Sequence, residues 1–141
     1  MITITRRLEF DAGHRITRHE AKCSHPHGHR YALEVTCQAP QLDECGRVID
    51  FGKIKDVLGG WIDEHLDHAF LVYQQDHTMV SMLQTGERGI PFRHFLLAAE
   101  PTAENIAQLM LGKCRELLAP FHISVVRVRV YETPNCWADA S

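Results

Sequence analysis

The hydrophobic residues of this chain change their spacing twice, from every second residue to every third or fourth residue and back again. Apolar residues of one parity run through 2–12, and a second alternating run follows at 31–37. Alternation places one face of a β-strand against a core. The sequence therefore predicts two strands, joined by one loop and paired antiparallel. Pro40 ends the second strand, because proline cannot donate to a strand ladder.

The middle of the chain has helical spacing instead. Apolar residues within 51–65 recur every third or fourth position, although the Gly-Gly pair at 59–60 lowers helix stability by about 1 kcal/mol per glycine relative to alanine. A second helix is predicted to begin after Thr102, which is a suitable N-cap residue, and to end at Pro120.

The segment between these helices, residues 70–100, has no regular period, and we predict a long loop with one short helix. Alternation returns at 122–132, which predicts a strand that Pro134 closes, and the tail 135–141 has room for one more short strand. The order is thus two strands, two helices, then one or two strands. This is an α+β plan with the helices packed on one face of a sheet.

Length and composition bound what the chain does. Its 141 residues are a common size for one domain, and no repeat or linker divides them, so we expect one domain over 1–141. A net charge of −3 without a basic run argues against nucleic acid as a partner. No apolar run approaches the roughly 20 residues that span a bilayer, which argues against a membrane role. The opening residues lack the apolar block of a signal peptide, and we expect a cytoplasmic protein.

Histidine is the unusual residue of this sequence, with ten copies and three of them at 25, 27 and 29. In an extended segment His27 and His29 point the same way and can converge on one zinc ion. Gly28 between them lets the backbone come close. His14 continues the parity of the first predicted strand, which we expect beside the second. Three neutral imidazoles leave a fourth zinc position open, which is the pattern of catalytic zinc sites.

Three other interpretations of these histidines stay open at this point. Surface loops sometimes accumulate histidine, and His19 and His25 are examples of that kind. Cys23 could complete a closed structural site with three histidines, or His25 and His27 could be the ligand pair without His29. Spacing alone does not separate these possibilities.

Cys23 lies four residues before His27, and a thiol beside a divalent cation ionises readily and can act as a nucleophile or base. The chain has an odd number of cysteines, five, at wide spacings, which argues against a disulfide framework. Asp67 and His68 form an adjacent pair in which the carboxylate can orient the imidazole for proton transfer. Glu132 ends the most apolar strand, where a carboxylate can accept hydrogen bonds from a flat heterocycle.

Six short motifs together resemble the 6-pyruvoyltetrahydropterin synthase / 6-carboxytetrahydropterin synthase family, and they occur in the family's order over nearly the whole chain. They are Phe10-Asp11-Ala12-Gly13-His14, Cys23-x-x-x-His27-Gly28-His29-x-Tyr31, Val48-Ile49-Asp50-Phe51, Leu66-Asp67-His68, Pro101-Thr102-Ala103-Glu104-Asn105 and Tyr131-Glu132-Thr133-Pro134.

The resemblance implies the tunnelling fold, an antiparallel four-stranded sheet with two helices inserted between strands 2 and 3. It also implies a homo-oligomer, typically a hexamer of two stacked trimers, with each site at a subunit interface. The similar enzymes act on the small molecule 7,8-dihydroneopterin triphosphate.

By the same resemblance each site residue has a role. His14, His27 and His29 look like the zinc ligands, and Cys23 looks like the catalytic base. Asp67 and His68 look like its relay partners. Glu132 looks like the carboxylate that anchors the pterin, and Thr102 like a nearby substrate contact. Arg15, Lys22 and Arg30 are near the site in sequence and are candidates for holding the triphosphate.

The compact Cys23 loop and the ending Tyr131 to Trp137 look more like the bacterial carboxy enzymes, which release acetaldehyde on the way to 7-deazapurines and queuosine. The alternatives are a pyruvoyl-type synthase, which eliminates triphosphate without acetaldehyde, and a non-catalytic pterin- or purine-binding or zinc-structural module. Two features depart from the family pattern. Ala69 stands where a second His or a Lys is frequent, and the segment 70–100 is longer than in compact members.

Overall fold

The structure is a computed structural model that describes residues 1–141, and one six-stranded sheet with the order β4-β3-β1-β2-β5-β6 organises it. The predicted strands are confirmed. β1 (Thr3–His14) and β2 (His27–Gln38) pair antiparallel over their whole length, from Thr3 opposite Gln38 to His14 opposite His27. β5 (Ser124–Thr133) and β6 (Cys136–Ala140) continue the antiparallel part. β5 begins two residues later than predicted, because His122 has a left-handed backbone with φ of 56°.

The expected four-stranded antiparallel sheet is wrong. The segment 70–100 does contain the one short helix that was predicted, but it also contains two strands in place of a long loop. β3 (Ala69–Tyr73) pairs parallel with the end of β1, and β4 (His94–Leu97) pairs parallel with β3. Between them lies α3 (His77–Thr85). β3 could not be recognised from alternation, because the strand is buried on both faces. Leu71 lies in the main core and Val72 packs under α3, so the apolar residues do not alternate with polar ones.

The two predicted helices are confirmed. The first is a continuous run of α1 (Phe51–Ile54), a π-helical turn η2 (Lys55–Gly59) and α2 (Gly60–His65), with the π turn ending at the predicted weak glycine pair. The second is α4 (Ala103–Leu118), and the Thr102 side chain accepts a hydrogen bond from the amide of Asn105 at 3.2 Å, as an N-cap should. Short 3₁₀ turns form η1 (Lys22–Ser24) and η3 (Ala119–Phe121). None of these helices has the length and apolar character to cross a membrane.

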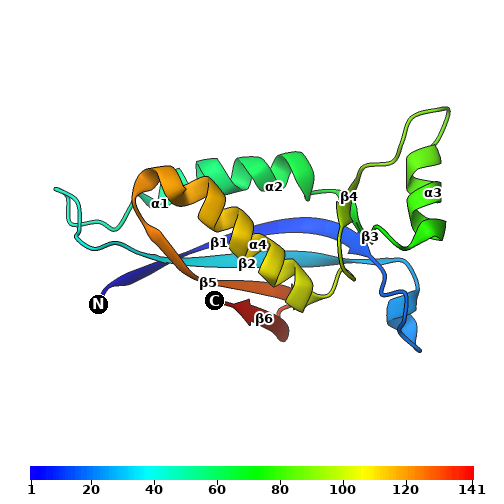
Figure 1. The fold of residues 1–141 in the computed structure, drawn as a ribbon, viewed down its shortest axis with the longest axis horizontal. Helices are drawn as coiled ribbons and strands as arrows, with labels where there is room; N and C mark the ends of the chain where they lie inside the picture. The colour runs from blue at the N-terminus through cyan, green and yellow to red at the C-terminus, as the bar shows by residue number, and fades with distance from the viewer.

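The main core lies between the sheet and the helices α1, α2 and α4, which cover one face of it (Figure 1). Phe10 and Tyr31 stack there with ring centroids 5.2 Å apart. α3 lies at one end of the sheet, where Met79 and Leu83 form a second small cluster with Val72. The face with the main core therefore presents the even positions of β1 and the odd positions of β2, because paired residues point the same way.

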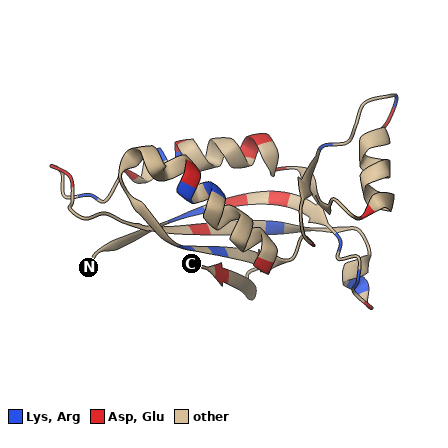
Figure 2. Ribbon diagram, viewed as in Figure 1, with Lys and Arg blue, Asp and Glu red and all other residues tan.

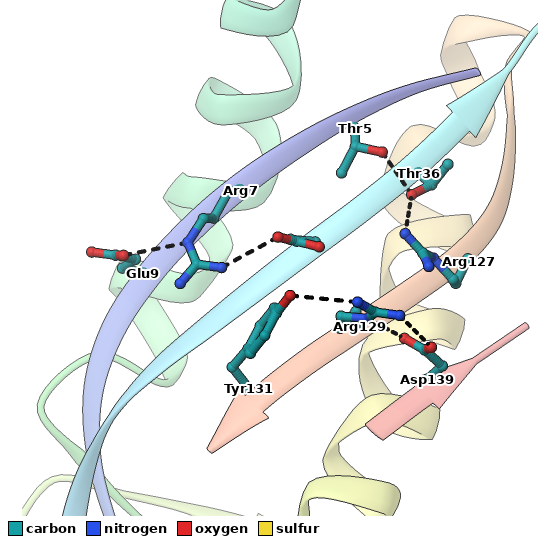
Figure 3. Close-up of polar contacts among 9 residues, drawn as sticks. Thr5, Arg7, Glu9, Thr36, Arg127, Arg129, Tyr131 and Asp139 are labelled. Atoms are coloured by element: carbon teal, nitrogen blue, oxygen red, sulfur yellow. Dashed lines mark hydrogen bonds and ion pairs between the residues drawn. The ribbon is translucent and has the colours of Figure 1, made fainter. Parts of the chain in front are cut away.

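Charged residues of both signs are interspersed along the four antiparallel strands (Figure 2). Most of those on β1 and β2 stand at odd positions of β1 and even positions of β2, which point away from the main core. Ion pairs between side chains of neighbouring strands neutralise many of these charges (Figure 3). Arg7 on β1 bonds Glu34 on β2 at 3.2 Å, and Arg129 on β5 forms two bonds of 2.7 and 2.8 Å with Asp139 on β6. The Arg7 guanidinium also lies 4.8 Å from the centre of the Tyr131 ring. One face of the sheet is thus dry and the other is ionic.

Candidate metal centre

His14, His27 and His29 meet at one end of the sheet, on the face that the main helices cover. The pairing puts His14 opposite His27 and Ala12 opposite His29, so the three imidazoles project to the same side. One ring nitrogen from each lies within 4.8 Å of the others, and this group could hold a metal ion. The alternation of β1 and β2 predicted this shared face, and the register between the strands brings the three side chains to the same end.

Two of the imidazoles have their tautomer fixed by a backbone carbonyl. The Nδ1 atom of His14 lies 2.7 Å from the carbonyl oxygen of Pro101, and that of His27 lies 2.6 Å from the carbonyl of His25. A carbonyl only accepts, so both Nδ1 atoms carry the hydrogen and both Nε2 atoms are left with a lone pair. This leaves two acceptor atoms aimed into one site, as metal ligands are.

The spacing of these acceptors fits a bound cation. The Nε2 atoms of His14 and His27 are 3.1 Å apart, and two nitrogens bound to one tetrahedral zinc ion are about 3.3 Å apart at metal–nitrogen distances near 2.0–2.1 Å. The Nε2 atom of His29 is buried and has no hydrogen-bond partner in the protein. Buried polar atoms without partners are rare in native proteins, and a metal bond satisfies all three nitrogens at once.

Burial also keeps the imidazoles in their ligating form. Only 1% of the His14 side chain is exposed, and desolvation lowers its pKa below the ordinary value, against the raising effects of its Pro101 bond and of Glu132. The pKa of His29 is likewise lowered, first by burial, while Glu132 acts in the opposite direction. Burial therefore favours the neutral form of both rings, which is the form that metal binding requires.

Glu132 stands at the rim of this group. Its carboxylate oxygens lie 3.5 Å from Nε2 of His29 and 4.0 Å from Nε2 of His14, and about a quarter of its side chain, 26%, is exposed. The hydroxyl of Tyr31, the next residue on this face of β2, is buried without a partner, and burial together with Glu132 raises its pKa. A molecule bound at the open side of the histidines would meet the Glu132 carboxylate.

Close strand contact at this end depends on glycine. A Cβ added at Gly28 would lie 3.3 Å from the carbonyl oxygen of Ala12, and one at Gly13 would lie 2.9 Å from the Phe70 ring and 3.3 Å from the carbonyl of His27. The interpretation of Gly28 as a residue that lets the backbone come close is therefore confirmed.

Cys23 lies outside the group of three histidines. It is half-buried in η1, in the loop 15–26 that joins β1 to β2, and its sulfur makes no hydrogen bond. The metal-ligating group does not contain it, so one chain by itself does not form the closed site with a thiolate ligand. His25 contributes a backbone carbonyl rather than its ring, and the His19 ring accepts a bond from the amide of Ala21 at 3.0 Å.

Asp67 and His68 form a pair of their own. Nδ1 of His68 lies 2.9 Å from one oxygen of Asp67, whose other oxygen accepts the amide of Asp11 at 3.0 Å. That amide and then His68 lower the pKa of Asp67. His68 has a left-handed backbone (φ 59°), and 75% of its side chain is exposed. It lines a cavity of about 640 Å³ with Phe70 and Arg93, and no hydrogen bond joins this pair to Cys23 or to the metal-ligating nitrogens of the same chain.

The candidate cations differ in availability. Arg15 bonds Asp76 through two contacts of 2.8 and 2.6 Å, and Arg30 bonds Asp11 at 3.0 Å and Glu9 at 3.2 Å. Lys22 makes no ion pair within the chain, and it is the one of the three whose charge is free for an anionic ligand. Sequence proximity alone did not distinguish these residues.

Three convergent imidazoles at one end of the sheet of an α+β fold could hold a metal ion, and three histidine ligands with one open position are the arrangement typical of catalytic zinc sites. The sequence model described as 6-pyruvoyl tetrahydropterin synthase matches residues 3–141. The chain is 42% identical to the 6-carboxy-5,6,7,8-tetrahydropterin synthase of Rickettsia bellii and 43% identical to that of Rickettsia felis, over 99% of each chain in both cases. The chain belongs to the 6-pyruvoyl tetrahydropterin synthase family, as the motifs predicted.

Solved structures agree with the fold. An uncharacterized protein from Wolinella succinogenes superposes with a TM-score of 0.85 at 24% identity, over 99% of this chain and 97% of its own. The 6-pyruvoyl tetrahydropterin synthase of Caenorhabditis elegans gives 0.70 at 21% identity, over 99% and 94%. At these identities the likeness concerns the fold, which is that of the family.

Proposed function

We propose that this chain is a zinc-dependent 6-carboxy-5,6,7,8-tetrahydropterin synthase. It would convert 7,8-dihydroneopterin triphosphate to 6-carboxy-5,6,7,8-tetrahydropterin, with release of acetaldehyde and triphosphate. The observation that carries the proposal is the set of three imidazole nitrogens that converge beside Glu132, one of which, Nε2 of His29, is buried without a hydrogen-bond partner. The names of the Rickettsia relatives, at 42–43% identity over almost the full chain, support the carboxy product.

The donor set suits zinc among the divalent metals. Neutral imidazoles are good zinc ligands, and three of them with one open position are the common catalytic arrangement. A zinc ion held by His14, His27 and His29 would act as a Lewis acid toward substrate oxygens. The chain's own residues then bind the ring and move the protons.

Glu132 is placed to hold the pterin ring, because an ionised carboxylate has two oxygens that accept from adjacent ring N–H and amino groups. Thr102, next to the Pro101 carbonyl that holds His14, is the proposed further substrate contact. Cys23 is the proposed base that takes the proton from the substrate side chain. Asp67 accepts from Nδ1 of His68, which leaves Nε2 of that ring free to exchange a proton with Cys23.

No hydrogen bond joins this pair to Cys23 within one chain, and this supports a site that is shared between copies. We propose a homo-oligomer, a hexamer of two stacked trimers, in which the Asp67–His68 pair of one copy reaches the Cys23 loop of another. Two features support association. Residues 3–11 of β1 have no strand on their outer side, and β6 is a free sheet edge. Free edges of this kind pair readily with another chain.

We also propose that the protein works in the cytoplasm, in the early steps toward 7-deazapurines and queuosine. All five cysteines are free thiols in the structure, which suits a reducing compartment.

The deciding experiment is a turnover assay of the zinc-loaded protein with 7,8-dihydroneopterin triphosphate, in which acetaldehyde and the pterin product are both measured. Acetaldehyde with 6-carboxytetrahydropterin is the expected result. Triphosphate release without acetaldehyde would instead favour a pyruvoyl-type synthase, and no reaction would favour a binding or zinc-structural module.

Two variants test the residue assignments in the same assay. Cys23→Ala is expected to abolish turnover while zinc content stays the same, and Cys45→Ala is the matched control because Cys45 is an exposed thiol in another loop. His27→Ala is expected to lose zinc, whereas His25→Ala should keep it because His25 supplies only a backbone carbonyl. Full zinc content in His27→Ala would show that the ligand assignment is wrong.

A further inference from the structure

The loop that carries Cys23 has little to hold it by itself. Residues 15–26 contain no fully buried side chain, and the loop projects from the end of the sheet where β3, β4 and α3 also lie (Figure 1). Most of its hydrogen bonds are internal, such as that from the Ile16 amide to the Cys23 carbonyl at 2.8 Å. Its position relative to the metal centre must therefore come from ties to the rest of the chain.

Two side-chain pairs supply those ties, beyond the His25 carbonyl at the end of the loop. At its start Arg15 forms the two bonds to Asp76, which is 4% exposed. Two residues further on, Thr17 donates two hydrogen bonds to the carboxylate of Glu100. Its amide donates to one carboxylate oxygen at 3.1 Å, and its hydroxyl donates to the other oxygen. One carboxylate thus fixes the backbone and the side chain of Thr17 together.

Glu100 is itself rigidly placed. Its carbonyl oxygen accepts from the Thr102 amide at 2.8 Å and from the side-chain amide of Asn105 at 2.9 Å, which locks it to the first turn of α4. The next residue, Pro101, holds Nδ1 of His14 through its carbonyl. Glu100 and Pro101, which directly precede α4, therefore hold two different parts of the site. Pro101 positions the proposed metal ligand His14, and Glu100 positions the loop of the proposed base.

The path from Glu100 to Cys23 is short. Glu100 fixes Thr17, Thr17 is bonded covalently to Ile16, and the Ile16 amide holds the Cys23 carbonyl. No other side chain from the body of the protein bonds residues 16–24. Loss of the Glu100 carboxylate would leave the more distant Arg15–Asp76 pair as the one side-chain tie between the start of the loop and the body of the protein.

We propose that Glu100 is a positioning residue, which holds the Cys23 loop in register with the three-histidine centre through Thr17. The inference rests on the proposed function, in which Cys23 is the base. Glu100 acts through Thr17 and does not touch the substrate in this scheme. A displacement of a reacting group by about 1 Å can cost roughly 100-fold in rate, so the clamp should affect turnover more than binding.

The test compares Glu100→Ala, Glu100→Gln and Thr17→Val with Glu64→Gln. Glu64 is the control because it lies in α2, is exposed, makes no side-chain hydrogen bond and belongs to none of the six motifs. We expect Glu100→Ala to lower kcat by about 10- to 100-fold with KM and zinc content close to native. Glu100→Gln should recover part of kcat, because its amide oxygen can still accept from the Thr17 amide while its NH2 group donates to the Thr17 hydroxyl oxygen. Thr17→Val should lower kcat in the same direction, and adding it to Glu100→Ala should cost little more, since both remove one clamp.

A second readout does not depend on turnover. Amide hydrogen exchange, followed by mass spectrometry of the zinc-loaded protein, should be about tenfold faster in the 15–26 peptide of Glu100→Ala and unchanged in peptides from α4. If the 15–26 peptide of Glu100→Ala exchanges faster but the native protein shows no turnover, Glu100 does hold the loop and the proposed reaction is rejected. Native kcat in Glu100→Ala, or native exchange in the loop, would overturn the positioning role. Loss of zinc or of α4 protection would overturn it in favour of a general structural role.

Discussion

The Nε2 atoms of His14 and His27 face each other at 3.1 Å, although a backbone carbonyl fixes the hydrogen of each ring on its Nδ1 atom. Two lone pairs at this distance repel each other unless a cation lies between them. The register of β1 and β2 and the Pro101 carbonyl hold the rings in place. The folded chain therefore holds the three imidazoles in an arrangement that suits a metal ion, and we expect it to bind zinc more tightly than the unfolded chain does.

This preorganisation predicts that zinc stabilises the fold. At a free zinc concentration about 1,000 times the dissociation constant, binding to the native state adds about 4 kcal/mol to the free energy of unfolding. Thermal unfolding with zinc and with a chelator should differ accordingly. His27→Ala should lose the difference and His25→Ala should keep it. Equal melting temperatures with and without chelator in the native protein would contradict the prediction.

The ion pair between Asp76 and Arg15 predicts a pH-dependent contribution to stability. The Arg15 bonds lower the pKa of Asp76 below its ordinary value near 3.9. A carboxyl group with a lowered folded-state pKa stabilises the native state above its unfolded pKa, and this contribution is lost as the pH falls through the folded-state pKa. Asp76→Asn keeps a capping side chain for the Met79 amide but removes the charge.

We therefore expect Asp76→Asn to lower the free energy of unfolding by about 2–3 kcal/mol at pH 7, measured by urea denaturation. The gap from the native protein should narrow below about pH 4. Asp50→Asn is the control, because Asp50 also caps a helix but its ion pair with Arg47 is exposed, and its effect should stay within about 0.5 kcal/mol. A gap of the same size at pH 3 and pH 7 would show that the charge of Asp76 is not its source.

Thr102 caps α4 in the structure and has a proposed functional role as well, and two substitutions separate these roles. Thr102→Ala removes the cap of α4 and should cost about 1 kcal/mol, whereas Thr102→Asn retains a capping oxygen and should be close to native in stability. If Thr102 also contacts the substrate, both variants should raise KM by roughly fivefold, the equivalent of one hydrogen bond. A native KM in Thr102→Asn would restrict Thr102 to the cap.

Local pattern was enough to predict the elements that carry the metal centre. The parity of His14, His27 and His29 with the strands around them follows from a period of two, and the N-cap at Thr102 follows from residue type. The register between β1 and β2 then brings the three rings together. The segment 70–100 failed the same analysis, because a short parallel strand buried on both faces has no alternation to detect.

The contacts that hold the site had no signal in the sequence. Glu100 and Thr17 are 83 residues apart, and Asp76 and Arg15 are 61 apart, so neither pair leaves a local pattern. The hydrogen bond between the Pro101 carbonyl and His14 could not be predicted from the sequence either, because every residue has a backbone carbonyl. Sequence motifs marked the groups that would do chemistry, whereas only the packing of α4 and α3 against the end of the sheet shows what holds them.

The proposed shared site predicts that two inactive variants restore each other's activity. In Cys23→Ala the base is missing, and in Asp67→Asn the orientation of His68 is lost. If each site takes Cys23 from one copy and the Asp67–His68 pair from another, random mixing of the two variants gives about a quarter of sites with both groups intact. Co-expression with two purification tags, followed by the acetaldehyde assay, would measure this recovery.

The matched control for this recovery is a mixture of Cys23→Ala with His27→Ala. Both residues belong to the end of the sheet where β1 and β2 of a single chain meet, so every mixed site still lacks one of them and no activity should return. Recovery in the first mixture and none in the second would place the Cys23 loop and the Asp67–His68 pair on different copies. If neither mixture recovers although mixed oligomers form, the pair must reach Cys23 within one chain, and the exposed His68 would have to move there.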